Sequence, residues 1–170
     1  MKYIVLILGL MFSSYVNASL PIQVSLEKLV KETDHLLVGR VIGVDMIDGN
    51  GDEIVNPNAR TGPGSQNKIR LIVSIDETII SDIKDVPQTL KIPLDPFMHF
   101  SLGQIKEAHR GKKYQVLFLL KGKDFQPPFD GIFRRSVSDK ERVVELMKSN
   151  KVKNENAASG KDAQKAARPF

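Results

Sequence analysis

The chain has 170 residues, with 25 Lys or Arg against 20 Asp or Glu, and it contains no cysteine. This length suits one domain with a single core, and the lack of cysteine excludes disulfides, thiol catalysis and cysteine-bound metals. Of the net charge of +5, Lys2 carries one and segment 151–170 carries a net three. The body, 19–150, is therefore nearly neutral, without the basic face of a nucleic-acid binder, and we expect no nucleic-acid partner.

The first eighteen residues, 1–18, have the pattern of a secretory signal peptide. Lys2 precedes an apolar run that extends from Tyr3 to Phe12, and the segment ends in the small residue Ala18. The apolar run is shorter than the roughly 20 residues that a membrane-spanning helix needs. The sequence therefore predicts cleavage after Ala18, a mature form without a membrane span, and a periplasmic or secreted location. The absence of disulfides favours a bacterial periplasm.

The first elements of the mature chain are predicted to be a helix and two strands. Ser25 is a suitable N-cap for a short amphipathic helix that ends near Asp34. A strand is predicted over 35–47, where Gly39 and Gly43 permit strong coiling. A second strand over 68–79 alternates between apolar and polar residues, so one of its faces is expected to be in contact with water.

The second half of the body predicts three further strands. Pro93 lacks an N–H group, which predicts that the strand over 88–94 lies at an edge or ends there. The strand over 113–121 is apolar on both sides, so we expect it to be the most buried, with Tyr114 and Phe118 in the core. A shorter strand follows over 131–137.

The end of the chain predicts a helix and then a tail. Ser138 and Glu141 have the spacing of a capping box, and an apolar stripe follows them. Segment 151–170 is rich in Ala, Lys, Asn and Ser and has few large apolar residues. Such a composition predicts a disordered basic tail, because too little apolar surface is available to order it.

Five mostly antiparallel strands with a helix at each end predict an α+β chain that is mainly β. We expect one domain over 19–150, folded as a five-stranded OB-like Greek-key barrel. Segments 25–44 and 111–119 resemble small exported bacterial proteins whose barrels are similar to the tissue-metalloproteinase-inhibitor/netrin-like domain. Because those inhibitors engage a catalytic metal through an N-terminal cysteine that this chain lacks, the resemblance implies a fold and not that mechanism.

The loop after the first strand carries oxygen ligands at alternating positions, Asp48, Asn50 and Asp52, as a calcium loop does at its start. The pattern is not completed, because Glu53 stands where an EF-hand has glycine and Ala59 where it has glutamate. The simpler interpretation is a flexible polar loop, and weak calcium binding is the alternative.

Other catalytic and metal signals are incomplete. His35, His99 and His109, together with Asp95, are suitable zinc ligands, but their spacing matches no zinc motif. Surface or capping roles explain these histidines more simply. The chain has no G-x-S-x-G elbow and no glycine-rich phosphate loop. We therefore expect no enzymatic activity and no cofactor.

The aromatic residues of the body all lie in its second half. Phe125, Phe129 and Phe133 flank a Pro-Pro pair that prevents regular strand pairing. These three rings can be interpreted in two ways. They fill one end of the barrel as a plug, or they form an exposed apolar patch that binds a partner and that Phe97 and Phe100 extend.

The connection between the first two strands, 48–67, is about 20 residues long and rich in Gly and Pro. Structureless loops of that length are usually functional or disordered, and in an OB-type barrel this loop helps to line the binding face. The sequence thus predicts an exported, non-enzymatic binding protein that recognises or inhibits an exported protein, as an inhibitor or immunity protein does. The alternative is a small-molecule or calcium-binding module.

Overall fold

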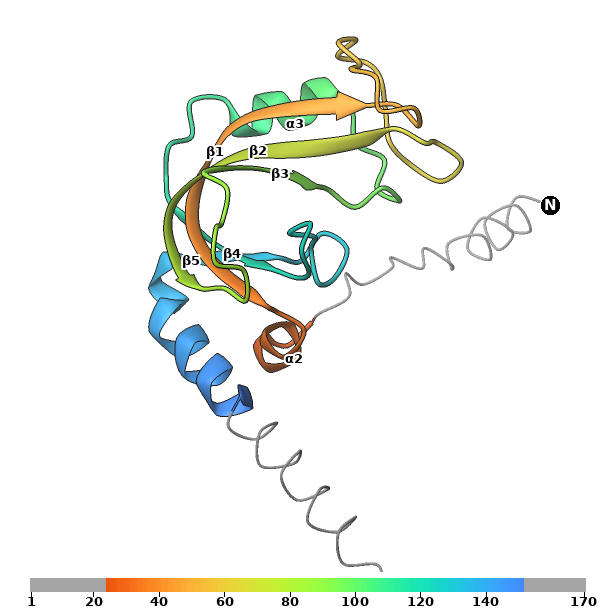
Figure 1. The fold of residues 1–170 in the computed structure, drawn as a ribbon. Coiled ribbons are helices and arrows are strands. Elements are labelled where there is room, and N and C mark those ends of the chain that lie inside the picture. The colour runs from red at the N-terminus through yellow and green to blue at the C-terminus, as the bar shows by residue number, and fades with distance from the viewer. Residues whose placement is uncertain (1–23, 152–170) are drawn as a thin grey trace, which may run out of the picture.

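The structure, a computed structural model, describes residues 24–151, so the predicted signal peptide and segment 152–170 of the predicted tail lie outside it. In chain order the elements are α2 (Leu26–Lys31), β1 (His35–Ile47), β2 (Lys68–Ile80), β3 (Thr89–Pro93), α3 (Leu102–His109), β4 (Val116–Leu120), β5 (Arg134–Ser136) and the 3-10 turn η1 (Val137–Asp139), followed by a closing helix over 140–151 (Figure 1). These elements form a mainly β chain of the α+β class, as predicted.

One antiparallel sheet contains all five strands, in the order β3-β2-β1-β4-β5. The central strand β1 pairs with β2 along its length, while its first residues, His35 to Gly39, also pair with β4. The sheet curves strongly, but its edges β3 and β5 are not paired with each other, so the described sheet is not closed into a barrel (Figure 1). Both edges are short, and β3 ends at Pro93, the edge position that the sequence predicts.

The coiling of β1 depends on its glycines. The pairing of β1 with β2 shifts register between Val38 and Gly39 and again between Val41 and Gly43. A Cβ atom on Gly39 would lie 2.5 Å from the carbonyl oxygen of Ser74, so only glycine allows β2 to approach there. These irregularities bend β1, which allows it to pair with β2 on one side and β4 on the other.

Apolar side chains form two cores, one on each face of the sheet. The inner core lies in the curve of the sheet and includes Leu37, Phe118 and Phe133. The outer core lies between the sheet and the two helices α2 and 140–151, and it includes Leu36 and Val38. Because successive side chains of β1 alternate between these cores, the start of this strand is buried on both faces.

The helix ends show which capping predictions hold. The Ser25 side chain accepts a hydrogen bond from the backbone of Lys28, which confirms the predicted N-cap of α2. The predicted capping box at Ser138 is wrong, because β5 runs directly into η1 and Ser136 accepts the backbone N–H of Ser138. Among residues 24–151, no helix is long and apolar enough to span a membrane.

Helix α3 was not expected from the sequence, although the sequence carries a signal for it. Ser101 and Gln104 form a complete capping box, with hydrogen bonds of 3.2 Å and 3.0 Å in the two directions. The core prediction for β4 holds for Phe118, which is fully buried, but is wrong for Tyr114, whose exposed fraction is 61%. The reason is that β4 begins at Val116, so Tyr114 precedes the strand.

Candidate functional site

A groove lies at the open side of the sheet, between the end of β3 and the connection from β4 to β5, with a volume of about 350 Å³. We call it the seam groove. Its walls come from the first residue of β2, the segment after β3 and the β4–β5 connection: Lys68, Pro93, Leu94, Asp95, Pro96, Gln126, Pro127, Asp130 and Gly131. Segments that are far apart in the sequence therefore line one site.

The β4–β5 connection has an irregular backbone that places its side chains on two sides. Phe125 has φ of 52°, and among the described residues it is the only non-glycine residue with positive φ. Its N–H donates to the carbonyl oxygen of Gly122, and Gln126 forms an isolated bridge with Lys121. This turn directs the Phe125 ring inward, with its centroid 4.7 Å from that of His35, while Gln126 lies exposed at the groove.

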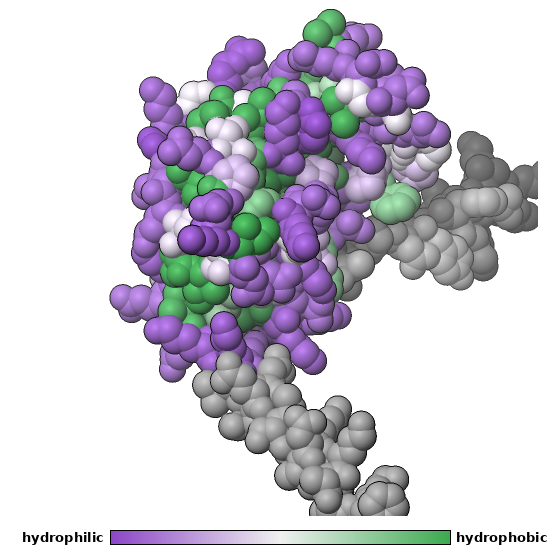
Figure 2. All heavy atoms as spheres, in the orientation of Figure 1, coloured by the Kyte–Doolittle hydropathy of each residue, from purple (hydrophilic) through white to green (hydrophobic). Residues whose placement is uncertain are grey.

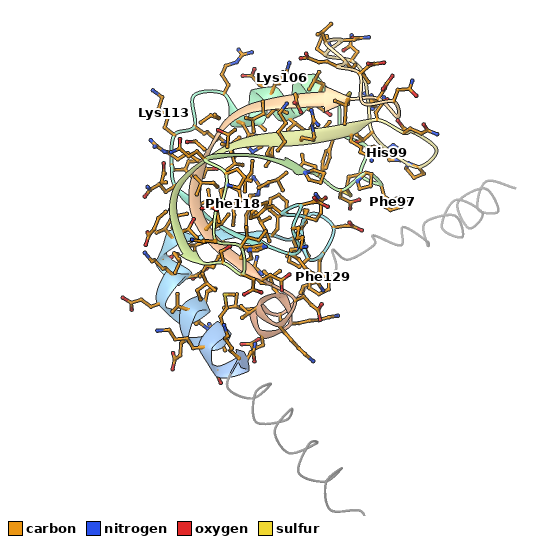
Figure 3. The ribbon with its side chains drawn as sticks, in the orientation of Figure 1. Phe97, His99, Lys106, Lys113, Phe118 and Phe129 are labelled. Atoms are coloured by element: carbon orange, nitrogen blue, oxygen red, sulfur yellow. The ribbon has the colours of Figure 1, made fainter. Side chains whose placement is uncertain are left out.

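The five predicted partner-binding phenylalanines differ in exposure. Phe125 and Phe133 have exposed fractions of 7% and 0% and belong to the inner core, where Phe133 stacks on Phe118. Phe100 and Phe129 are half-buried, and Phe97 has an exposed fraction of 66%. Phe125 and Phe133 are therefore core residues that are not exposed for contact, whereas Phe97 is exposed. Figure 3 shows Phe97 and Phe129 on the same side of the molecule.

The segment that carries Phe97 is held by hydrogen bonds to the 48–67 loop. The Thr61 hydroxyl donates to the carbonyl oxygen of Met98 at 2.6 Å, and the Thr61 N–H donates to that of Phe100 at 2.9 Å. Asp95 also accepts the backbone N–H of Phe97. As a result, Phe97 and the half-exposed Met98 are displayed on a fixed backbone beside the seam groove.

The 48–67 loop is itself packed onto the fold. Its carbonyl groups at Pro57 and Ala59 accept the N–H groups of Gly103 and Leu102, at the start of α3. Ile54 and Ala59 also pack against the inner core. The loop therefore braces α3 and the segment after β3, a role carried by backbone contacts that a sequence pattern does not reveal.

The predicted calcium ligands form a turn. One oxygen of the Asp48 carboxylate accepts the backbone N–H groups of both Asn50 and Asp52, at 2.8 Å and 3.0 Å. Within residues 24–151, no group of three or more His, Cys, Asp or Glu residues is arranged to hold a metal ion. Asp48 thus stabilises its own loop through an Asx-type turn.

The structure also keeps the three histidines apart. The buried ring of His35 bonds Ser81 and the carbonyl oxygen of Gly122, which ties β1 to the β4–β5 connection. His99 packs against Gly62 in the 48–67 loop, and His109 lies at the end of α3. Each histidine thus has a separate local role, and Asp95 lies with none of them in a metal-binding group.

An ion cluster crosses three strands next to the groove. Asp45 on β1 accepts two hydrogen bonds from Arg70 on β2 and lies 3.3 Å from the Lys91 ammonium on β3. Burial acts to raise the pKa of Asp45, but the hydrogen bonds and charges of Arg70 and Lys91 outweigh it, so the pKa lies below its usual value. Because Arg70 is in register with Pro93, this cluster fixes the groove end of β3.

Comparison of the chain with protein-family models, with curated proteins and with solved structures finds no match.

Proposed function

We propose that the chain is an exported, non-enzymatic binding protein that recognises a protein partner at the seam groove, in the manner of an inhibitor or immunity protein. One observation supports this proposal above the others. None of the five phenylalanines predicted for partner binding lines this groove, but their chain neighbours do: Asp95 and Pro96 precede Phe97, and Gln126, Pro127, Asp130 and Gly131 lie within 125–133. Export rests on the signal-peptide pattern of residues 1–18.

The position of the groove supports the proposal because it resembles the position at which an OB barrel binds its ligands. An OB barrel is partly open, and it binds ligands over its second and third strands between the β1–β2 and β4–β5 loops. In this chain the strand order β3-β2-β1-β4-β5 would become a ring if β3 met β5. The seam groove lies at that opening and takes walls from Lys68, the first residue of β2 after the β1–β2 loop, from the end of β3 and from the β4–β5 loop. We propose an OB-like architecture on this basis.

The groove walls favour one chemistry of partner. Pro93, Leu94, Pro96 and Pro127 supply apolar walls, and Asp95 and Asp130 outnumber the single cation Lys68. Such walls suit an extended segment of the partner that presents apolar side chains and a lysine or arginine. Phe97 adds an exposed aromatic ring beside the groove, a residue type that is enriched at protein–protein interfaces. Polar surface surrounds the apolar residues on the face drawn in Figure 2.

The test is affinity capture from an exported-protein extract, with wild-type protein and three single variants as bait. Asp130→Arg changes an exposed residue of the groove wall, Phe97→Ala an exposed residue beside it, and Tyr114→Ala removes a similarly exposed aromatic ring elsewhere. We expect one partner that wild type and Tyr114→Ala retain, and that the two groove variants bind about tenfold or more weakly.

Because all three positions are exposed, circular dichroism and thermal melting should be unchanged, which separates loss of binding from loss of folding. The proposal fails if the groove variants and Tyr114→Ala retain the same proteins equally, or if wild type retains none.

A further inference from the structure

A second set of pockets lies away from the seam groove, around segment 110–116, between the end of α3, β1 and β5. Three pockets adjoin there. His109 and Lys112 line two of them, and Tyr114 and Arg134 line two. We call this the α3–β5 pocket. None of its lining residues belongs to the groove, and Figure 3 shows Lys113 at the left of the molecule and Phe97 at the right.

The α3–β5 pocket gathers positive charge. No Asp or Glu is among its lining residues, which include Arg40, Lys112, Lys113, Arg134 and Arg135. Asp76 neutralises Arg40 through two hydrogen bonds. The other four cations form no ion pair within the part of the chain that the structure describes. The nearly neutral overall charge of 19–150 does not reveal this cluster, because the clustered cations come from segments that are distant in the sequence.

Arg134 lines two of the three adjoining pockets and is half-buried. Its guanidinium carbon lies 5.5 Å from the centroid of the Phe133 ring, which fixes the side chain against the inner core. Its Nη1 donates to Nε2 of His109 at 3.2 Å, and Nδ1 of His109 donates to the carbonyl oxygen of Ile105 at 3.0 Å. This arrangement makes His109 a neutral acceptor, so it orients the guanidinium without neutralising it.

Burying a charge is costly, and half-buried guanidinium groups are usually paired with a carboxylate. Desolvation lowers the pKa of Arg134 from its usual value, but an arginine stays protonated in proteins. Its remaining guanidinium nitrogens retain contact with solvent, because the described residues hold no buried side-chain nitrogen without a hydrogen-bond partner. A planar, charged fork of this kind matches an oxyanion.

We propose that the α3–β5 pocket binds a tetrahedral oxyanion, a phosphoryl or sulfuryl group, either free or as part of a larger ligand. Arg134 supplies the central charged hydrogen bonds, and His109 is its positioning residue. Lys112 and Lys113 add charge at the rim. This site is independent of the seam groove, so each proposal can fail without the other.

The first experiment is an NMR titration of the purified protein with inorganic phosphate and with sulfate, against sodium chloride at the same ionic strength. We expect saturable shifts of backbone amides in 109–116 and 134–136 with both oxyanions and not with chloride. Arg134→Gln should weaken binding about tenfold or more, since it removes charge-assisted hydrogen bonds. The matched control is Arg142→Gln, which changes an exposed arginine on the closing helix.

A second variant tests whether Arg134→Gln weakens binding only because it disturbs the fold. Lys112 and Lys113 are exposed, so the double change Lys112→Gln and Lys113→Gln leaves the cores intact and should still weaken phosphate binding. Shifts that chloride reproduces, or a phosphate affinity that neither the Arg134 variant nor the double variant reduces, would overturn the proposal.

The two sources of a phosphoryl group are separated with vesicles of phosphatidylglycerol, compared with phosphatidylcholine, in a sedimentation assay. Binding to phosphatidylglycerol that Arg134→Gln abolishes supports the site and identifies a lipid headgroup. Phosphate binding lost in Arg134→Gln, without vesicle binding, supports the site and identifies a soluble anion. Vesicle binding that persists in Arg134→Gln, without saturable phosphate binding, overturns the site, because general surface charge then explains the binding.

Discussion

Phe133 provides a decisive test of which aromatic residues hold the fold and which are free to bind. Its ring is fully buried in the inner core and stacks on Phe118, with the ring centroids 6.4 Å apart. Replacing a buried phenylalanine with alanine costs about 3–5 kcal/mol, because apolar contacts are lost and a cavity remains. A typical domain has only about 5–15 kcal/mol of unfolding free energy. Phe133→Ala should therefore remove a large part of the stability.

Urea unfolding followed by circular dichroism measures the effect. We expect the midpoint to fall by about 2 M for Phe133→Ala, taking a typical slope of about 1–3 kcal/mol per M. The matched control is Phe97→Ala, which should change the unfolding free energy by less than about 0.5 kcal/mol, because two thirds of this side chain is exposed. A loss below about 1 kcal/mol for Phe133→Ala, or above about 2 kcal/mol for Phe97→Ala, would refute the division between core and surface.

Two further predictions concern strand pairing. Gly39→Ala should destabilise the protein by about 1–3 kcal/mol in urea unfolding, because its Cβ would lie 2.5 Å from the backbone oxygen of Ser74. Gly43→Ala, whose Cβ would first meet a side-chain carbon of Ile72 at 3.3 Å, should cost less, and equal losses would contradict this explanation. Asp45→Asn should destabilise at pH 7 and destabilise less at about pH 3, below the unfolded pKa, since a carboxylate with a lowered pKa stabilises the fold fully above its unfolded pKa and loses that contribution as pH falls through its folded pKa. Urea unfolding at both pH values measures this, and an equal loss at each would show that the charge of Asp45 is not involved.

The sequence by itself determined most of the elements. The bounds of β1 match the prediction, Ser25 caps α2, and Pro93 marks the end of an edge strand. These features depend on nearest neighbours in the chain: alternation of side chains, a capping hydroxyl, a missing N–H group. Helix α3 was also within reach, because the capping box of Ser101 and Gln104 is local.

Only the tertiary structure decided which residues line a site. The positive φ of Phe125 directs its ring inward, and its neighbour Gln126 remains at the seam groove. Arg134 lies beside His109 because β5 pairs with β4 near the end of α3. Such positions depend on contacts between segments that are distant in the sequence. The charge that these segments gather, and the burial of their side chains, arise only when the chain folds. The chain order therefore predicted the strands, while the curve of the sheet created the groove and the charged pocket.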